Sequence, residues 1–324
     1  MAINTHRGLY WYKRLPFGVA SAPSIFQCTI KSILQGIPHV TVYIDDILIT
    51  GTTQEEHLHN LEEVLGRLEK ANIRLKLCKC AFFLPSVHYL GHRISAQGFQ
   101  PLTDRVKAIQ DAPAPRNVSQ LKSFLGSLNY YSKFLPNLSS TLAPLYRLLH
   151  KSARWNWGTE QQAAFNHAKH SLSSDSLLVH YDPSKELILA CDASPYGVGA
   201  VLSHKLENGI EKPIAFASRS LAPAEKKYSQ LDKEALAIIF GVKRFYQYLY
   251  GRQFTILSDH QPLQHIFGEH KATPTLTSAQ IQRWALTLAA YHYHIVTNLV
   301  LPWKCRYVES ATTPSHSLHS SHTR

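Results

Sequence analysis

The sequence predicts an α+β, or mixed α/β, protein in which two sheet-forming regions flank a helical one. Strand-like runs of β-branched and aromatic residues are concentrated in about the first 100 residues and again after residue 178, whereas short amphipathic helices dominate between them. At 324 residues the chain is long enough for two or three domains with real cores. We therefore divide it into residues 1–100, 101–178 and 179–300. A Ser/Thr/His-rich tail at 301–324 has too little apolar content to fold.

The first region is predicted to contain two helices around a hairpin. Apolar residues at helical spacing indicate one helix from about Ala22, and a second over TQEEHLHNLEEVLGRLEKANI, with a face of leucines and Val64. Thr53 and Glu56 fit a capping box at the start of this second helix. Between the helices, VTVYIDDILIT predicts a hairpin with both aspartates at its tip. The later runs IRLKL, CAFFL and VHYLGHRIS are strand-like.

The adjacent carboxylates of this hairpin, Asp45 and Asp46, are candidate metal ligands. Asp is a common turn residue, so one of the two needs no functional explanation. Two like charges about 4 Å apart, however, repel by roughly 4 kcal/mol at an effective dielectric constant of about 20, and a turn requires only one such side chain. Mg²⁺ would reverse the sign of that interaction, because it prefers hard oxygen ligands when it also binds substrate phosphates.

The middle and third regions differ in periodicity. TDRVKAIQ, NVSQLKSFLGSLNYYSKFL, TLAPLYRLLH and TEQQAAFNHAKHSL predict a series of short helices, and Thr159 with Gln162 fits a second capping box. In the third region, ELILACDAS, GVGAVLSH and KPIAFASRSL predict three strands. One long helix over residues 224–251 and a further strand, FTILSDH, follow them. This order favours a mixed sheet covered by helices.

Three carboxylates of the third region occupy positions where burial is expected. Glu234 lies within the apolar stripe of the long helix, three residues after Leu231 and four before Ile238. Asp192 interrupts the apolar run LILACDA, and Asp259 ends the strand FTILS. A Glu at the edge of a stripe can also extend its carboxylate to solvent. Three buried like charges are costly without a cation, so these carboxylates are candidate ligands of two Mg²⁺ ions, with Mn²⁺ as an alternative.

The composition indicates the class of binding partner and the cellular compartment to expect. With 34 basic and 22 acidic residues, the formal net charge is +12, which favours a polyanionic partner such as nucleic acid. Five scattered cysteines, no long apolar stretch and no signal pattern lead us to expect an intracellular protein, cytoplasmic or nuclear, without a membrane partner. A Cys-x-Cys pair with two later histidines resembles a zinc site, but its spacing is too short, so an apolar strand with two surface histidines is preferred. These residues are Cys78, Cys80, His88 and His92.

Several ordered motifs resemble the Pol polyprotein of gypsy-like LTR retrotransposons. LPFGVASAPSIFQ, YIDD and VHYLGHRIS resemble the template-and-nucleotide loop, the metal-binding hairpin and the primer grip of its reverse transcriptase. SFLGSLNYYSKFLPNLS resembles its thumb and connection, and ACDASPYGVGAVLSH, DKEALAII and TILSDHQPL resemble its ribonuclease H domain. The similarity spans about residues 3 to 295. It implies a partial reverse transcriptase palm, a helical thumb and connection, and a ribonuclease H-like five-stranded mixed sheet with helices.

The resemblance also implies roles for individual residues. Asp45 and Asp46 would be catalytic metal ligands of the polymerase, and Asp192, Glu234 and Asp259 those of the nuclease. Lys79 would be a candidate proton donor to pyrophosphate. The implied nucleotide- and primer-binding residues are Phe17, Gly18, Tyr43, Lys79, Leu90 and Gly91.

Two departures from the family pattern limit the expected activity. The family's polymerase has a further metal-binding carboxylate in a segment resembling LDL-x-x-AY, and this chain begins downstream of it. The family's nuclease has a fourth metal-binding Asp, but YHYHIVTNLVLPWKCRYVES replaces that segment, leaving Glu309 as the candidate. We expect a retroelement-derived ribonuclease H-type hydrolase that acts on RNA–DNA hybrid and binds primer-template nucleic acid, with RNA-directed DNA polymerase activity lost. The alternative is a non-catalytic nucleic-acid-binding relic.

Overall fold

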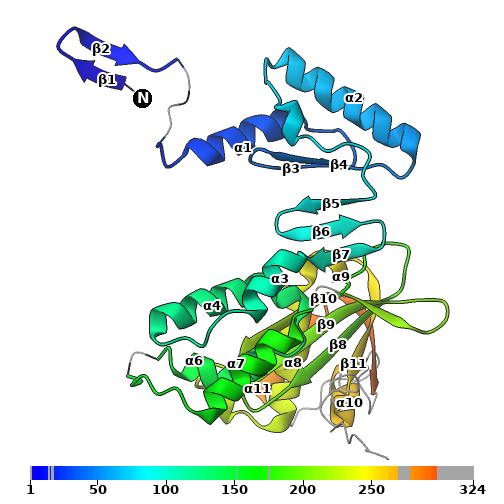
Figure 1. Cartoon of the computed structure of the whole chain (residues 1–324). Coiled ribbons are helices and arrows are strands. Elements are labelled where there is room, and N and C mark those ends of the chain that lie inside the picture. Colours follow the sequence, from blue (N-terminus) through cyan, green and yellow to red (C-terminus); the bar gives the residue numbers. More distant parts are fainter. Residues whose placement is uncertain are drawn as a thin grey trace, which may run out of the picture. The chain divides into compact units, whose positions relative to one another are not determined.

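The computed structural model describes residues 2–13, 15, 18–150, 152–173, 176–268 and 278–297. Two compact units, residues 1–90 and 91–324, make up the chain (Figure 1). Phe17, Glu309 and the predicted tail at 301–324 lie outside the described residues. The finer division into four parts stays a prediction.

The first unit contains a separate N-terminal hairpin, two helices and a second hairpin. Its elements are β1 (Ala2–Thr5), β2 (Gly8–Trp11), α1 (Ala22–Ile33), β3 (Val40–Tyr43), β4 (Asp46–Ile49), α2 (Gln54–Lys70), the 3₁₀ helix η1 (Leu77–Lys79) and β5 (Ser86–Tyr89). Helices α1 and α2 share a core with the β3–β4 hairpin, because Ile30, Val64 and Leu68 are buried against Val42 and Ile47. Both predicted helices and the predicted hairpin are therefore present.

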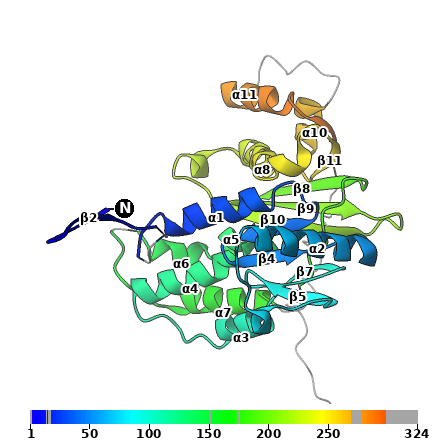
Figure 2. The same ribbon diagram turned by 90° about the horizontal axis from the view of Figure 1, so that it is seen from above.

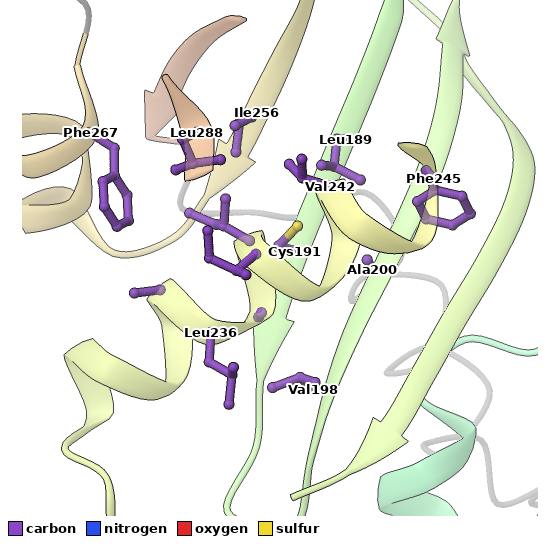
Figure 3. Packing of buried hydrophobic residues seen from close by; sticks show 14 of the residues in the cluster. Leu189, Cys191, Val198, Ala200, Leu236, Val242, Phe245, Ile256, Phe267 and Leu288 are labelled. Carbon is purple, nitrogen blue, oxygen red and sulfur yellow. The ribbon is translucent and has the colours of Figure 1, made fainter. Parts of the chain in front are cut away.

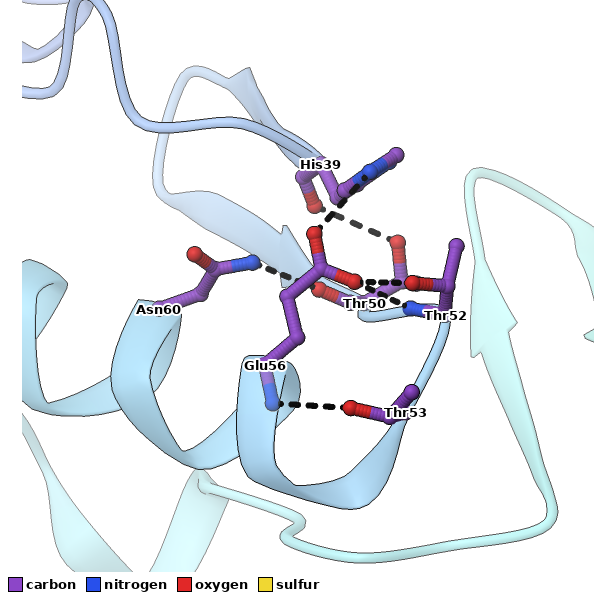
Figure 4. Close-up of polar contacts among 6 residues, drawn as sticks. All are labelled: His39, Thr50, Thr52, Thr53, Glu56 and Asn60. Atoms are coloured by element: carbon purple, nitrogen blue, oxygen red, sulfur yellow. Dashed lines mark hydrogen bonds and ion pairs between the residues drawn. The ribbon is translucent and has the colours of Figure 1, made fainter.

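At the start of α2, the Thr53 half of the predicted capping box is present, and the Glu56 half differs. Thr53 Oγ1 accepts a hydrogen bond from Glu56 N at 3.2 Å. The Glu56 carboxylate makes its main hydrogen bonds one residue earlier than a capping box requires: it accepts from the backbone N of Thr52 at 2.7 Å and from the Thr52 hydroxyl. It also lies 3.3 Å from His39 Nε2 (Figure 4). These hydrogen bonds from Thr52, more than the charge of His39, lower the pKa of Glu56.

The buried face of α2 is rotated from the predicted one. Leu58 and Leu65, expected on that face, are 40% and 37% exposed, whereas Asn60 is fully buried. The amide of Asn60 donates from Nδ2 to the carbonyl of Thr50 at 3.1 Å, just beyond the end of β4 (Figure 4). A polar residue that binds the backbone can therefore displace leucines from the core-facing side of a helix.

Two strand predictions in the first unit are wrong. IRLKL and CAFFL form irregular backbone and the short helix η1. Apolar alternation indicates a strand only where a core receives the side chains, and here Leu75, Leu77 and Phe83 remain exposed. The third run, VHYLGHRIS, does form two strands, β5 and β6.

The second unit opens with the β6–β7 hairpin and a run of helices. These elements are β6 (His92–Ser95), β7 (Gly98–Pro101), α3 (Thr103–Gln110), α4 (Val118–Tyr130), η2 (Ser132–Phe134), α5 (Leu138–Thr141), α6 (Ala143–Arg147) and α7 (Thr159–Ser171). At the start of α7, the second predicted capping box lies one residue earlier than expected. Gly158, not Thr159, precedes the helix, and Gln161 Oε1 accepts from Gly158 N at 3.1 Å. Gln162 instead accepts from Trp157 Nε1 at 2.8 Å.

The sheet of the second unit is the predicted mixed five-stranded sheet. Its elements are β8 (Leu187–Ala193), β9 (Gly197–Lys205), β10 (Glu211–Ser220), η3 (Glu225–Lys227), α8 (Gln230–Arg244), α9 (Tyr246–Leu249), β11 (Gln253–Ser258), α10 (Gln261–Phe267), α11 (Ala279–Leu288) and β12 (His292–Thr297). The strand order is β10-β9-β8-β11-β12. Strands β8, β9 and β10 are antiparallel, whereas β11 is parallel to both β8 and β12.

The long helix predicted over residues 224–251 is shorter and divided. The 3₁₀ helix η3 precedes α8, and the short helix α9 follows it. Ser229 stops the main helix from extending further toward the N-terminus, because its Oγ accepts from Asp232 N at 3.1 Å and caps the first turn. At the other end, the backbone leaves helical geometry at Phe245.

Helices cover both faces of this sheet (Figure 2). On β8, Leu189 and Cys191 join the core formed with α8, and the alternate residues Ile188 and Ala190 face the other side. The side chains of Leu189, Cys191 and Ala200 on the strands and of Leu236 and Val242 on α8 lie in one cluster (Figure 3). The helix approaches the strands closely at Gly241, where an added Cβ would lie 3.0 Å from Cys191 Sγ. A side chain at this position would require Cys191, Ala200 and Leu189 to move by a few tenths of an ångström.

The helical run packs directly on the sheet through two glycines of β9. A Cβ on Gly199 would lie 2.3 Å from Asn137 Oδ1, and a Cβ on Gly197 would lie 2.4 Å from Ser139 Oγ. The backbone N of Ser139 donates to Ser218 Oγ on β10 at 3.1 Å. Helix α5 therefore rests against the backbone of β9 and β10. Among the described residues, no helix is both long and apolar enough to cross a bilayer.

Candidate active site

Two strands and one helix bring Asp192, Glu234 and Asp259 together. Strands β8 and β11 pair in parallel with Ala190 beside Leu257, and the same register continued by two residues brings Asp192 beside Asp259. Glu234 approaches from the second turn of α8. One ligand oxygen from each carboxylate can be chosen so that all three atoms lie within 4.8 Å of one another. The three carboxylates expected from the sequence thus form one cluster.

The cluster is partly shielded from water. Glu234 is 4% exposed, as its place in the apolar stripe predicted, and the two aspartates are half-buried. Gln230, one turn earlier on α8, donates from Nε2 to Glu234 Oε1 at 2.7 Å and so orients that carboxylate. The surroundings are negative: burial raises the pKa of the Cys191 thiol most, and the charges of Glu234 and Asp192 raise it further. A divalent cation would offset that potential.

The turn after Asp192 is held from outside the sheet. Ser194 Oγ accepts from the backbone N of Tyr196 and of Gly197, at 3.2 and 2.9 Å. The same oxygen lies 2.7 Å from the hydroxyl of Ser140 on α5. This support was not foreseen from the sequence, because the two serines lie 54 residues apart along the chain and no local pattern indicates that they meet.

The other pair of carboxylates lies on the β3–β4 hairpin. Ile44 and Asp45 form its two-residue turn, and Asp46 pairs with Tyr43 as the first residue of β4. The prediction that both carboxylates lie at the tip is therefore wrong for Asp46. Both aspartates and Tyr43 are exposed. Burial raises the pKa of nearby Tyr89, and the charge of Asp46 raises it further.

The hairpin turn is strained and clamped. Ile44 has φ of 51°, a left-handed conformation that β-branched residues rarely adopt. Gln27 of α1 holds this geometry, since its Nε2 donates to Val42 O at 3.0 Å and its Oε1 accepts from Ile44 N. A clamped turn fixes the direction of the neighbouring carboxylates. In the parts of the chain that the structure describes, only Asp192, Glu234 and Asp259 form a group of three or more His, Cys, Asp or Glu side chains close enough together to hold a metal ion.

The remaining predicted residues are distributed along the chain. Gly18 is exposed with φ of 82°, and Lys79 is exposed at the end of η1. Leu90 and Gly91 have consecutive φ angles of 45° and 69°, as in a two-residue type I′ turn. The carbonyl of Gly91 accepts from Tyr131 Oη at 2.9 Å.

Two features predicted for the Cys78, Cys80, His88 and His92 segment differ in the structure. His92 is not a surface histidine but is 9% exposed. Its ring stacks with those of Tyr130 and Phe134, at centroid distances of 5.4 and 5.7 Å. CAFFL, read there as an apolar strand, is irregular.

Comparison with known proteins identifies the family of this chain. The family model described as reverse transcriptase (RNA-dependent DNA polymerase) matches residues 1–94, and the model of the RNase H-like domain found in reverse transcriptase matches residues 182–291. The chain is 36% identical to the Transposon Tf2-3 polyprotein of Schizosaccharomyces pombe over 91% of its own length. It is 38% identical to the Retrovirus-related Pol polyprotein from transposon 297 of Drosophila melanogaster, again over 91%. The chain belongs to the gypsy-like LTR-retrotransposon Pol family.

This Pol chain spans 22% and 27% of the lengths of those two relatives. Among solved structures, it matches a foamy viral protease-reverse transcriptase in complex with dsDNA, with a TM-score of 0.76 and 26% identity over 93% of this chain and 53% of that one. It also matches the foamy viral enzyme in complex with RNA/DNA hybrid, with a TM-score of 0.73 and 25% identity over 100% of this chain and 43% of that one. These matches confirm the predicted fold class.

Proposed function

We propose that this Pol chain cleaves the RNA strand of an RNA–DNA hybrid at the cluster of Asp192, Glu234 and Asp259. The observation that carries the proposal is the convergence of three carboxylates, one of them buried, from three elements of one unit. Rigid strands and a helix hold catalytic groups more accurately than loops do. The solved relative described as bound to RNA/DNA hybrid supports the choice of substrate.

Two Mg²⁺ ions fit the cluster. Its donors are carboxylate oxygens, which hard cations prefer, and three like charges within 4.8 Å of one another call for a compensating positive charge. Asp192, Glu234 and Asp259 would hold the ions, and Mn²⁺ would serve as an alternative. When bound, a metal pair supplies an activated water and stabilises the leaving oxygen of a phosphodiester.

The chain's own contribution is to fix the carboxylates in advance. Asp192 and Asp259 are positioned by the parallel register of β8 and β11. Glu234 is oriented by Gln230, and its burial keeps water from competing for the carboxylate. Groups that need no reorganisation during the reaction contribute most to stabilising its transition state.

Cleavage of a hybrid with a labelled RNA strand tests the proposal. We expect Mg²⁺-dependent cleavage of the RNA in the hybrid and none in an RNA duplex of the same sequence. Tight binding of the hybrid without cleavage, in Mg²⁺ and in Mn²⁺, would instead support the non-catalytic relic as the function of this chain.

Primer extension by this chain alone is expected to be absent. Within the described residues, no third carboxylate joins Asp45 and Asp46 at metal-binding distance, and two-metal phosphoryl transfer requires a ligand set that holds both ions in advance. The measurement is incorporation of labelled nucleotide on an RNA template with Mg²⁺ and with Mn²⁺. Template-dependent products that vanish on Asp45→Asn would show the prediction to be wrong.

Hybrid binding is expected to weaken steeply with salt and to show little sequence preference. The net charge of +12 and the exposed cations Lys70, Arg74, Lys76 and Lys79 favour contacts to phosphates. If several phosphates are neutralised, affinity should fall log-linearly, by about two orders of magnitude between roughly 50 and 200 mM salt.

A matched control for the salt experiment lies on the same helix. Arg67 already donates to Gln35 O at 2.7 Å and to Ile33 O at 3.2 Å, so its guanidinium serves the fold. Lys70→Ala should therefore reduce the salt slope by about one, and Arg67→Ala should leave it unchanged. A flat salt profile for the unsubstituted chain would contradict backbone recognition.

A further inference from the structure

Three tyrosines, two exposed and one half-buried, lie beyond the end of α8 that is opposite to Glu234. Tyr246 and Tyr250, one helical turn apart, are 47% and 56% exposed, and their ring centroids lie 4.9 Å apart with the planes tilted by 30°. Tyr291 meets both rings nearly at right angles, at 6.4 and 5.9 Å. It packs in turn against the buried Phe254 at 6.3 Å. We call Tyr246, Tyr250 and Tyr291 the tyrosine platform.

The platform belongs to a stretch of chain without carboxylates. No Asp or Glu occurs between Glu234 and Asp259. Lys243 and Arg244, in the last turn of α8 just before the platform, are both exposed. Residues 278–297, which supply Tyr291, contain no Asp or Glu either. The surroundings of the platform along the chain are therefore basic and aromatic.

The platform is separate from the carboxylate cluster. Glu234 lies in the second turn of α8 and Arg244 ends the helix, so about 15 Å of helix separates them at 1.5 Å per residue. A ligand atom that contacts the platform therefore cannot also contact Asp192, Glu234 or Asp259. Any role of the platform is additional to the proposed cleavage.

We propose that the tyrosine platform binds single-stranded nucleic acid. Base rings stack on the exposed faces of Tyr246 and Tyr250, and Lys243 and Arg244 neutralise the adjoining phosphates. Stacking on aromatic side chains tolerates any base sequence, because every base has a flat face. A second copy of this chain is a poorer occupant, since it carries the same net charge of +12 and would be repelled from this basic surface.

The test uses the whole chain with Asp192→Asn, so that no assay depends on cleavage. The probe is a single-stranded DNA oligonucleotide with 2-aminopurine, whose fluorescence falls when the base stacks. We expect Tyr246→Ala with Tyr250→Ala to weaken binding by about tenfold and to remove the change in fluorescence. Tyr246→Phe with Tyr250→Phe should keep both, because the ring and not the hydroxyl makes the contact. Leu286→Ala, an exposed apolar residue on α11, should change neither.

Three results would overturn the proposal. The first is unchanged affinity and fluorescence in the double alanine variant. The second is an equal loss in the double phenylalanine variant, which would exclude ring stacking as the cause. The third is a wild-type dimer in sedimentation that the alanine variant converts to a monomer, which would identify a second copy as the occupant. Absence of hybrid cleavage by the wild-type chain would contradict the proposed function and leave this assay unaffected.

Discussion

Replacing Asp192 by Asn is expected to abolish hybrid cleavage, a loss on the order of a thousandfold or more, while hybrid affinity stays within about twofold. The lost charge would act on the transition state through the metal ions, whereas affinity comes from contacts to phosphates elsewhere on the chain. Glu234→Gln should behave in the same way, because Glu234 lies in the same cluster within 4.8 Å. The measurements are single-turnover cleavage and equilibrium binding of the same labelled hybrid.

The matched control is Glu207→Gln, which removes an exposed carboxylate of the same unit from the turn between β9 and β10. It should leave cleavage and binding unchanged. Equal activity in wild type and in all three variants would reveal a contaminating nuclease and would remove the enzymatic interpretation.

Thermal melting gives a second, independent readout of the same variants. Without Mg²⁺, Asp192→Asn should raise the melting temperature, because it removes one of three like charges that repel one another. With Mg²⁺, the wild-type chain should gain stability by mass action, and the variant should gain less. A variant that melts lower than wild type in both conditions would mean that the carboxylate stabilises the fold without a metal.

Replacing Gly98 by Ala is expected to destabilise the second unit by about 3 kcal/mol. Gly98 has φ of 141°, and an added Cβ would lie 2.0 Å from the carbonyl oxygen of Leu178. That carbonyl accepts from Phe99 N at 2.8 Å, and Leu178 N donates back to Phe99 O at 3.0 Å. The backbone cannot move away without breaking this pair of hydrogen bonds, so strain and lost bonds add together. The denaturation midpoint of the chain measures the effect.

Gly209→Ala separates the backbone strain of a positive φ from the steric contact with Leu178. Gly209 has φ of 77°, which also disfavours a side chain, but a Cβ there would meet nothing within 4 Å. We expect a loss of about 1 to 2 kcal/mol from backbone strain alone. If both variants lose the same amount, the contact with Leu178 contributes nothing and the prediction for Gly98 is wrong.

The cluster of Asp192, Glu234 and Asp259 could be predicted because its signals are local. Glu234 breaks the apolar periodicity of its own helix, and Asp192 and Asp259 stand at the ends of apolar strands. Each of these patterns needs only about ten residues of sequence. That the three carboxylates converge depends on the parallel pairing of β8 with β11, which no local pattern specifies.

Other features depend on contacts that a local pattern cannot contain. IRLKL alternates like a strand and CAFFL is a short apolar run, yet Leu75, Leu77 and Phe83 stay exposed, so neither pattern corresponds to a strand. Ile44 takes a left-handed backbone conformation that its residue type disfavours, and only the bonds from Gln27 explain it. The hydrogen bond between Ser140 and Ser194 joins residues 54 positions apart.

The packing of α5 on β9 limits how members of this family can exchange domains by recombination. Gly197 and Gly199 lack side chains at the points where Ser139 and Asn137 touch the strand, so the two segments fit as a matched pair. A recombination event at residue 178 would separate them, and an RNase H-like sheet from another retroelement with bulkier residues on that strand would clash with this helix. Proteins that exchange this sheet should therefore keep the helix and the strand together, or replace both at once.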